Sequence, residues 1–404
     1  MKKNGILLIA LFVLVFDSCK KEPEPLAVLN LTQNELKVLK QGNSFGFDLY
    51  SLLAKENPDS NLCLSPYSIY SALSMAANGA AGKTLDEMLT LLGYPGHEVV
   101  DLNRAVKNLN GVLVGKDPNT VFETANSVWY NTNGFVIYPD FQSNMELYFN
   151  AVTQGLDFNL PSALPAVNAW VKEKTHDKVK KIIEKINPED VCFLINAIYF
   201  NGRWTTPFNK KETHLNSFTE ASGKVLQVPT MYIKDTISVI NSTELQAAAL
   251  PYGDGSWLMY LFLPSAGVDL DNWCSSQFST GWDHLRSQFY PVDDMELYLP
   301  QFKLECSFEL SKQLKDSGIP TAFSNAADFS KLGPGSLAIS QVLHKTYIDV
   351  NEEGTEAAAV TAVIITRTSM PVNQVRFNRP FFFVIAEKTT GSIIFMGKLM
   401  NPNL

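Results

Sequence analysis

Apolar side chains recur at helical spacing in three segments of the first half of the chain. They repeat every three to four residues in 44–56 and in 65–79, and the second segment begins with Ser65-Pro66, a typical helix start. Residues 165–186 show the same spacing, with lysines gathered on one face. We therefore expect helices in these three segments, and the first two should face the core.

Strand patterns dominate the rest of the chain. Residues 121–130 have a strand pattern, and 191–200 are almost continuously apolar, as expected for a strand that is buried on both faces. From Lys224 to the C-terminus strands prevail, apart from a short helix expected around 308–316. No internal repeat or low-complexity linker follows about Val28. The chain therefore predicts one large α+β domain, rich in helices early and in strands late.

Composition indicates a folded globular protein without a nucleic-acid partner. Of the 404 residues, 46% are hydrophobic and 18% are charged, which is enough apolar material for a large core. Thirty-three Lys and Arg oppose 41 Asp and Glu, giving a net charge of -8. That charge has the wrong sign for a surface that grips a phosphate backbone, so DNA and RNA are excluded as expected partners.

The N-terminus has the pattern of a secretory signal. Lys2 and Lys3 precede an apolar run of eleven residues, 6–16, and the small residue Ser18 stands before Cys19. A membrane-spanning helix needs about 20 apolar residues, so the run predicts an export signal that is removed. The segment resembles a bacterial lipoprotein signal, which implies cleavage before Cys19 and attachment of a lipid to its sulfur.

This interpretation divides the chain into three parts. Residues 1–18 are the expected signal peptide, 19–38 a tether and 39–404 the folded domain, and the polar, proline-containing stretch 20–25 suits a flexible spacer. We expect a bacterial outer membrane lipoprotein that is held to the membrane through its N-terminal lipid and faces the periplasm or the outside. The alternative is a cysteine that merely follows an apolar run.

The remaining cysteines show no metal-binding pattern. Cys63, Cys192, Cys274 and Cys306 are widely spaced and form no CxxC pair, so no zinc site is expected. Four cysteines of an exported protein can pair in three ways. Because Cys63 and Cys192 stand among apolar neighbours, where a thiol acts as a small hydrophobic side chain, we expect free, buried thiols.

An unusual segment lies between the strand patterns of 341–350 and 375–386. An exposed loop is normally polar and interrupted by Gly, Pro and Asn, but here Gly354 is followed by small and β-branched residues with no breaker before Pro371. The segment 352–373 therefore has the composition of a strand that has no sheet.

The alternative for this segment is a helix. Thr355 could cap it and Ala357, Ala358 and Ala359 could propagate it, and on local propensity that structure is at least as favourable. The consecutive β-branched residues that follow, 363–365, weaken the helix because they favour a pleated backbone.

Several motifs together resemble one protein family. Residues 352–359 resemble the proximal hinge of serpins, 375–385 resemble their C-terminal signature, and 196–204 resemble their central strand and breach. The start of the shutter helix is matched by Leu-Ser-Pro-Tyr-Ser-Ile at 64–69. These motifs run in the family's order from about residue 40 to the end, so the resemblance covers the whole expected domain.

The resemblance implies a fold and a function. The fold would be the serpin fold, an α+β structure with a large central β-sheet, further sheets, about eight or nine helices and an exposed reactive-centre loop at about 352–375. The function would be suicide-substrate inhibition of serine endopeptidases and, in some members, cysteine endopeptidases. It implies no enzymatic activity, cofactor or metal, and a monomer.

The resemblance also assigns roles to residues. The hinge must slip between two strands after cleavage, so small side chains matter there; a period of two sends Thr355, Ala357 and Ala359 under the sheet and leaves Glu356 in water. The expected hinge residues are Glu352, Gly354, Thr355, Glu356, Ala357, Ala358 and Ala359. The expected shutter and breach residues are Ser65, Ser68, Asn196, His344 and Trp204.

The scissile bond has two possible registers. Counting forward from Gly354 by the family's usual loop length gives Thr368 as the acyl-forming residue, whereas counting back from Pro380 gives Ser369. Arg367 is the basic residue in the centre of the loop, where a trypsin-like protease would cut, and elastase-like enzymes would prefer Thr368. We predict Thr368 as the principal site and Arg367 as an adjacent one, with trypsin-like and elastase-like proteases as partners.

Two other classes of function remain as alternatives. An exported hydrolase is disfavoured because the chain has no Gly-x-Ser-x-Gly or HExxH motif and its five histidines lie far apart in the sequence. A surface binding protein with the serpin fold but without inhibitory activity is the second alternative. Nothing in the hinge sequence spoils insertion, which favours the inhibitor.

Overall fold

The computed structural model describes residues 31–187, 189–355 and 373–403, and these described residues form one compact unit. Its first element is helix α1 (Gln33–Glu56), which starts at a capping box formed by Thr32 and Glu35. The helix therefore begins well before residue 44, and residues 33–38 of the expected tether are its first turns. Val38 in these turns is buried, so the folded part starts earlier than the expected boundary at 39.

Helices cover the sheets, and their bounds refine the sequence expectations. The helix expected over 65–79 is confirmed as α2 (Pro66–Ala77), which is capped by the Ser65 side chain; this side chain accepts a hydrogen bond from Ser68 N. The short helix expected around 308–316 begins only at Ser311, because the preceding residues form a strand. The other helices are α3 (Gly82–Leu91), α4 (Val99–Leu113), α5 (Pro139–Phe149), α7 (Leu270–Thr280), α8 (Trp282–Arg286) and α9 (Ser311–Asp316); α2 spans Pro66–Ala77.

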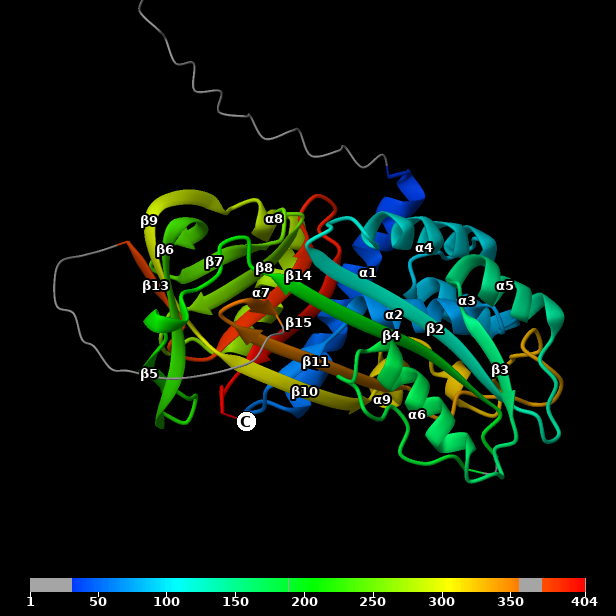
Figure 1. Cartoon of the computed structure of the whole chain (residues 1–404). Helices are drawn as coiled ribbons and strands as arrows, with labels where there is room; N and C mark the ends of the chain where they lie inside the picture. The colour runs from blue at the N-terminus through cyan, green and yellow to red at the C-terminus, as the bar shows by residue number, and fades with distance from the viewer. Residues whose placement is uncertain (1–30, 188, 356–372, 404) are drawn as a thin grey trace, which may run out of the picture. The chain divides into compact units, whose positions relative to one another are not determined.

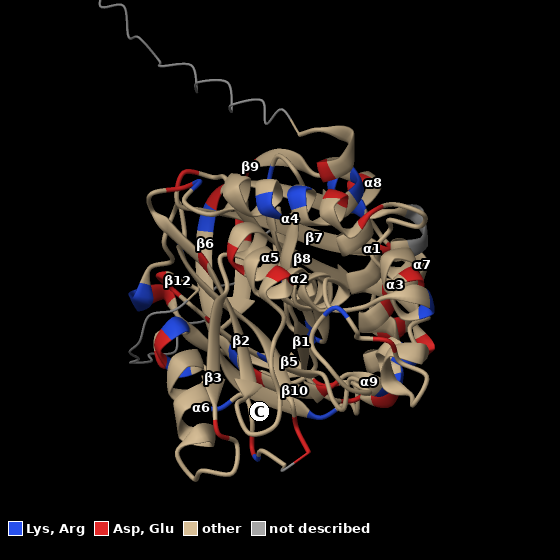
Figure 2. Ribbon diagram, turned by 90° about the vertical axis from the view of Figure 1, so that its right-hand side faces the viewer, with Lys and Arg blue, Asp and Glu red and all other residues tan. Residues whose placement is uncertain are grey.

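Helix α6 (Ala163–Lys174) is shorter than the helix expected over 165–186. Thr175 ends it, and His176 and Asp177 then adopt left-handed backbone angles, with φ of 48° and 66°. These angles break the helical hydrogen-bond ladder although neither residue is a glycine. The lysines of α6 are interspersed with acidic residues (Figure 2), and Lys172 pairs with Asp177 at 3.1 Å.

The first sheet has six strands in the order β10-β11-β12-β4-β2-β3. Helix α6 lies in front of this sheet in Figure 1, whereas α1 and α2 lie behind it. The strand predicted at 121–130 is confirmed as β2, which pairs antiparallel with β4. The strands are β2 (Thr120–Asn131), β3 (Val152–Leu156), β4 (Cys192–Arg203), β10 (Phe302–Glu309), β11 (Leu343–Asn351) and β12 (Gly354–Thr355).

Strand β4 differs from the expected strand buried on both faces. Ile195 and Ala197 are buried, but Leu194, Asn196 and Ile198 are only half-buried. The physical reason is local, because these half-buried residues border cavities between β4 and β11. The apolar run therefore indicated the strand correctly and overstated its burial.

The second sheet has nine strands in the order β1-β15-β14-β8-β7-β6-β9-β13, and β5 pairs with β6. Its buried strands β14 and β15 form the centre of the core. The strands are β1 (Leu62–Leu64), β5 (His214–Thr219), β6 (Val225–Asn241), β7 (Leu245–Tyr252), β8 (Trp257–Pro264), β9 (Tyr290–Pro300), β13 (Gln374–Arg376), β14 (Phe381–Glu387) and β15 (Ile393–Leu399).

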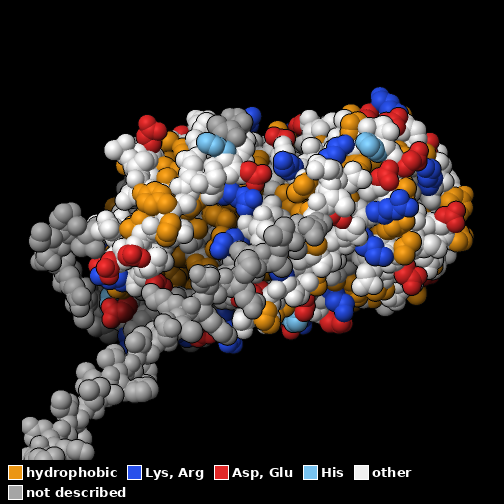
Figure 3. All heavy atoms as spheres, turned by 90° about the horizontal axis from the view of Figure 1, so that it is seen from above, with side chains coloured by type: hydrophobic (Ala, Val, Ile, Leu, Met, Phe, Trp, Pro, Cys, Tyr) orange, Lys and Arg blue, Asp and Glu red, His pale blue; other side chains and the backbone are white. Residues whose placement is uncertain are grey.

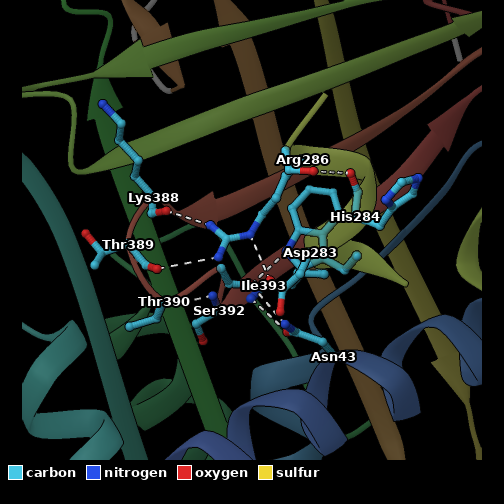
Figure 4. Close-up of polar contacts among 12 residues, drawn as sticks. Asn43, Asp283, His284, Arg286, Lys388, Thr389, Thr390, Ser392 and Ile393 are labelled. Carbon is cyan, nitrogen blue, oxygen red and sulfur yellow. Dashed lines mark hydrogen bonds and ion pairs between the residues drawn. The ribbon is translucent and has the colours of Figure 1, made fainter. Parts of the chain in front are cut away.

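The turn between β14 and β15 is held from two sides (Figure 4). From α1, Asn43 donates to Gly391 O at 2.9 Å and accepts from Ile393 N at 3.0 Å. From α8, the Arg286 guanidinium donates to Lys388 O at 2.7 Å. These contacts join the N-terminal helix, α8 and the C-terminal hairpin, three parts of the chain that are distant in sequence.

The described residues thus form nine α-helices and two sheets, which confirms the expected α+β fold with about eight or nine helices; of the further sheets expected beside the large one, the described residues contain one. On the face seen in Figure 3, side chains of both charges are interspersed with small hydrophobic patches. Among the described residues, no helix combines the length and the apolar character needed to cross a membrane.

Candidate functional site

The two residues of β12 form a wedge between β4 and β11. Gly354 pairs with Asn351 of β11 and with Arg203 of β4, and Thr355 continues both antiparallel ladders. Within the described part of the chain, no backbone pairing joins β4 directly to β11. β12 therefore connects the two strands at one end. Beyond β12, the facing edges of β4 and β11 do not pair with each other within the described part of the chain.

Gly354 is the residue that lets the chain enter the sheet. Its φ is +152°, and a Cβ atom there would lie 2.0 Å from Gly202 O and 2.7 Å from Arg203 Cα. Any side chain would collide with the backbone of β4, which cannot move aside without breaking its own pairing. The glycine predicted for the hinge is thus required by the close approach of two backbones.

Thr355 is held beneath the sheet by a stack of aromatic rings. Its side chain is buried, and its Oγ1 lies 2.6 Å from Tyr252 Oη. The Tyr252 ring stacks on Trp204 with centroids 4.3 Å apart, and Trp204 Nε1 donates to Asn351 O at 2.8 Å. Burial raises the pKa of Tyr252, so this phenol stays neutral and hydrogen-bonded. The stack fixes both the end of β11 and the first inserted residue.

The turn between β11 and β12 is anchored by two glutamates. Glu352 is buried, and its Oε1 accepts hydrogen bonds from Thr213 Oγ1 at 2.6 Å and from Gln301 Nε2 at 2.8 Å. Glu353 pairs with Lys210 at 2.5 Å, and this contact lowers the pKa of the glutamate. The turn is therefore fixed where the chain reverses direction toward the gap.

A cavity of about 260 Å³ continues the gap away from β12. Its walls are 192–196 of β4, 341–345 at the start of β11, and α2, while Ile182 and Ile183 lie on the side of α6. A smaller cavity of about 30 Å³ lies between 196–200 and 344–347. Both cavities are bordered by β4 and β11, so they mark space between the two strands.

His344 links the gap to the start of α2. Its Nε2 accepts a hydrogen bond from Ser65 N at 3.0 Å, which places the ring proton on Nδ1. Burial lowers the pKa of His344 to about 4, so the ring is neutral near pH 7. Both cavities are lined by this residue.

Asn196, which borders the same two cavities, has a side-chain oxygen without a hydrogen-bond donor among the described residues. Its Nδ2 donates to Asn126 Oδ1 at 2.8 Å, and Ser68 Oγ donates weakly to its main-chain oxygen at 3.5 Å. Its Oδ1 is buried and has no hydrogen-bond partner among the described residues. A buried acceptor without a donor costs about 1–3 kcal/mol, so a donor entering the gap would be stabilised here.

The structure thus brings Ser65, Ser68, Asn196 and His344 together beside the cavities and places Trp204 at the end where β12 enters. The sequence did not indicate Tyr252, Thr213 or Gln301, which hydrogen-bond to Thr355 or Glu352. Each of these contacts is tertiary, and no local sequence pattern predicts it. Outside the described residues lie Cys19, Glu356, Ala357, Ala358, Ala359, Arg367, Thr368 and Ser369.

The four described cysteines are free, as predicted, and Cys192 is the one that is only half-buried. Burial raises the pKa of all four thiols, which suits unreactive core residues. The described residues contain no cluster of three or more His, Cys, Asp or Glu that could hold a metal ion.

Comparison with known proteins gives a consistent result. Residues 40–402 match the family model "Serpin (serine protease inhibitor)". The chain is 33% identical to a serpin-like protein of Methanosarcina acetivorans over 377 residues, covering 91% of this chain and 87% of that protein. It is 33% identical to Iripin-3 of Ixodes ricinus over 392 residues, covering 92% and 96%.

Solved structures agree with the sequence relatives. The thermophilic serpin tengpin in its native state superposes with a TM-score of 0.79 at 31% identity, covering 92% of this chain and 95% of that one. Thyroxine-binding globulin in complex with thyroxine gives a TM-score of 0.83 at 26% identity, covering 91% and 99%. The chain therefore belongs to the serpin family of serine protease inhibitors.

Proposed function

We propose that this protein is a suicide-substrate inhibitor of serine endopeptidases, which traps the acyl-enzyme by inserting its cleaved loop between β4 and β11. The observation that carries the proposal is the position of β12. Gly354 and Thr355, near the start of the loop, already pair with both strands, while among the described residues the edges of β4 and β11 beyond them do not pair with each other. A further strand would complete the sheet.

The register of β12 defines where each inserted residue would lie. Each step along the loop from Thr355 is one step back along β4, so Ala357 would come opposite Phe200 and Thr361 opposite Asn196. The pairing with β11 places Thr361 opposite His344 as well. Every second residue shares the face of Thr355, which is buried. The Thr361 hydroxyl would then meet the unfilled Asn196 Oδ1.

Insertion would stop the protease before it completes hydrolysis. The protease nucleophile attacks the scissile carbonyl, forms an acyl bond to the loop and releases the new amino terminus. The thirteen residues 355–367 then span roughly 40 Å as an extended strand at about 3.3 Å per residue. The protease is carried over that length and pressed against the inhibitor, and deacylation fails once the triad and oxyanion hole lose their alignment.

The centre of the loop suggests the target class. Arg367 suits the acidic specificity pocket of trypsin-like enzymes, whereas Thr368 suits elastase-like enzymes. Ser369 would be the acyl-forming residue if the loop is counted back from Pro380. We propose Thr368 as the principal site with Arg367 as the adjacent one.

The proposed location is the bacterial outer membrane, through a lipid on Cys19 after removal of residues 1–18. There the inhibitor would shield the cell envelope from proteases. A Cys19→Ala variant expressed in a bacterium should lose incorporation of a fatty-acid label but keep the melting temperature of the folded domain. Labelling that persists in this variant would contradict the proposal.

The proposed inhibitory function is tested by mixing the purified protein with trypsin or with an elastase. An adduct that survives denaturing gel electrophoresis, with its mass equal to the protease plus the cut inhibitor, is the expected result. Complete cleavage of the loop without any adduct would instead favour the non-inhibitory binding protein. Sequencing the fragment released from the adduct identifies the scissile bond.

A further inference from the structure

Two buried cysteines lie where the two sheets meet in the core. Cys306 is in β10 of the first sheet, and Cys63 is in β1 of the second sheet. Strand β1 packs against both β10 and β11 (Figure 2). Cys63 is completely buried, and Cys306 is 8% exposed. The two residues therefore belong to strands that contact each other, although they are distant in sequence and lie in different sheets.

Thr346 of β11 contacts both cysteines. It lies directly opposite Cys306 in the antiparallel ladder of β10 and β11, and both side chains belong to the buried face of these strands. Side chains opposite each other in such a ladder are about 5 Å apart. On its other side, the Thr346 hydroxyl donates a hydrogen bond to Cys63 O at 2.8 Å. The two cysteines are therefore neighbours around one hydroxyl group.

The two thiols also affect each other's ionisation. Burial raises the pKa of Cys63 well above its usual range, and the neighbouring Cys306 raises it further. Burial raises the pKa of Cys306 to about 11, although hydrogen bonds from the Cys63 main chain and the Thr346 side chain act in the opposite direction. A disulfide needs Cα atoms no more than about 7 Å apart, and a thiol that reaches the main chain of the other cysteine is consistent with this spacing.

We propose that Cys63 and Cys306 form a disulfide when the chain folds in an oxidising compartment. One thiolate attacks a disulfide oxidant, either oxidised glutathione or the active-site disulfide of an envelope thiol–disulfide oxidoreductase, and releases one thiol of the oxidant. The second thiolate displaces the other half, so the cysteines lose two hydrogens and the oxidant becomes two thiols. In the folded protein the raised pKa of both buried groups keeps them as thiols, so the reaction takes place before β1 is covered.

The proposed export of the protein supplies the oxidant. Disulfides persist in exported proteins, whereas cytosolic thiols are kept reduced. The inference rests on this proposed export in the cell, and it is independent of the proposed inhibition. Refolding the purified chain with a defined oxidant tests the cysteine pair without export, so a failure of either proposal can be distinguished from a failure of the other.

The bond would strengthen one side of the gap without crossing it. Strand β10 pairs with the edge of β11 that faces away from β12 and β4. On the same side of the gap, β11 is already tied to β1 and the start of α2, because Thr346 donates to Cys63 O and His344 accepts from Ser65 N. A bond between β10 and β1 therefore leaves β4 free to separate from β11. It also closes a loop of roughly 240 residues, which restricts the unfolded chain.

The test refolds the full-length Cys19→Ala protein from urea, either with oxidised glutathione or with a reductant. Free thiols are then blocked with iodoacetamide, and the denatured protein is digested with trypsin. Each of the four remaining cysteines falls on its own peptide, and these peptides are 56–83, 186–203, 235–286 and 304–312. The expected product links 56–83 to 304–312, with a mass two hydrogens below the sum of the two peptides. Cys192 and Cys274 should carry the blocking group, and the reductant should abolish the link.

Two further measurements use the intact linked protein. Its melting temperature should be several degrees above that of the reduced protein, because the closed loop lowers the entropy of the unfolded chain. In Cys63→Ser this difference should vanish, whereas the matched control Cys192→Ser should keep it. Titration with trypsin should consume the same number of inhibitor molecules per trapped protease for the linked and the reduced form.

Two results would overturn the inference. One is a protein refolded with oxidised glutathione in which peptides 56–83 and 304–312 stay unlinked or are linked mainly to other peptides. The other is a linked form that no longer traps trypsin while the reduced form does, since the bond would then cross the moving parts. The peptide map needs no substitution of Cys63 or Cys306, so it decides even where Cys63→Ser does not fold. If neither form traps trypsin, the proposed inhibition fails, and the map still decides on the bond.

Discussion

Replacing Thr355 with arginine tests the entry point of the inserted strand. The Thr355 side chain is 3% exposed, and its hydroxyl contacts Tyr252, which is completely buried and stacked on Trp204. In the uncut variant the arginine can stay in water by giving up the β12 pairing, so insertion would then have to bury a guanidinium without an ionic partner, which costs several kcal/mol. Taking about 3–4 kcal/mol as the added barrier, insertion would slow by a factor on the order of 10² to 10³.

Hydrolysis would then win the competition, and the Thr355→Arg variant should behave as a substrate. The assay titrates trypsin with the variant and separates adduct from cleaved inhibitor on a denaturing gel, while the melting temperature of the uncut protein shows that the fold is intact. The matched control is Glu356→Arg, since residue 356 belongs to the opposite face of the inserted strand and its side chain would stay in water. Trapping by Thr355→Arg as efficient as that of the parent would refute the reasoning.

Two further predictions follow from the loop and from the buried histidine. Arg367→Ala should lower the rate of trapping of trypsin-like enzymes more than that of elastase-like enzymes, and an equal loss for both would show that Arg367 does not contact the specificity pocket. Because the pKa of His344 falls from 6.5 to about 4 on folding, its contribution to stability is complete above pH 6.5 and is lost as the pH falls toward 4, by at most about 3 kcal/mol. Urea unfolding of the parent and of His344→Gln at pH 8 and pH 5 checks this, with His97→Gln as the exposed control; the same pH dependence in all three proteins would exclude His344 as the cause.

The sequence predicted the parts of the structure that depend on local pattern. Helix α2 and strand β2 follow from periodicity. Gly354 itself could be assigned to the hinge by resemblance, but its physical reason, the contact with Gly202 O, required the paired backbones.

Tertiary contacts account for what the sequence could not predict. Tyr252 meets Thr355 from 103 residues away and Thr213 meets Glu352 from 139 residues away, so no spacing in the chain links them. The end of α6 was misplaced because His176 and Asp177 take left-handed angles that are rare for residues other than glycine. The burial of β4 was overestimated because an apolar run does not show that, within the described residues, β4 has no direct pairing with β11.

The central claim is that the uncut protein holds its large sheet incomplete and that cleavage of the loop completes it. The most direct measurement compares the melting temperature of the intact protein with that of the same protein cut once in the loop by an enzyme that it does not trap. Completion of the sheet predicts that the cut form melts several degrees higher, because several kcal/mol of new backbone and side-chain contacts are gained and each kcal/mol raises the melting temperature of a domain of this size by about 1–2 °C. A cut form that melts at the same temperature as the intact protein, or below it, would contradict the claim.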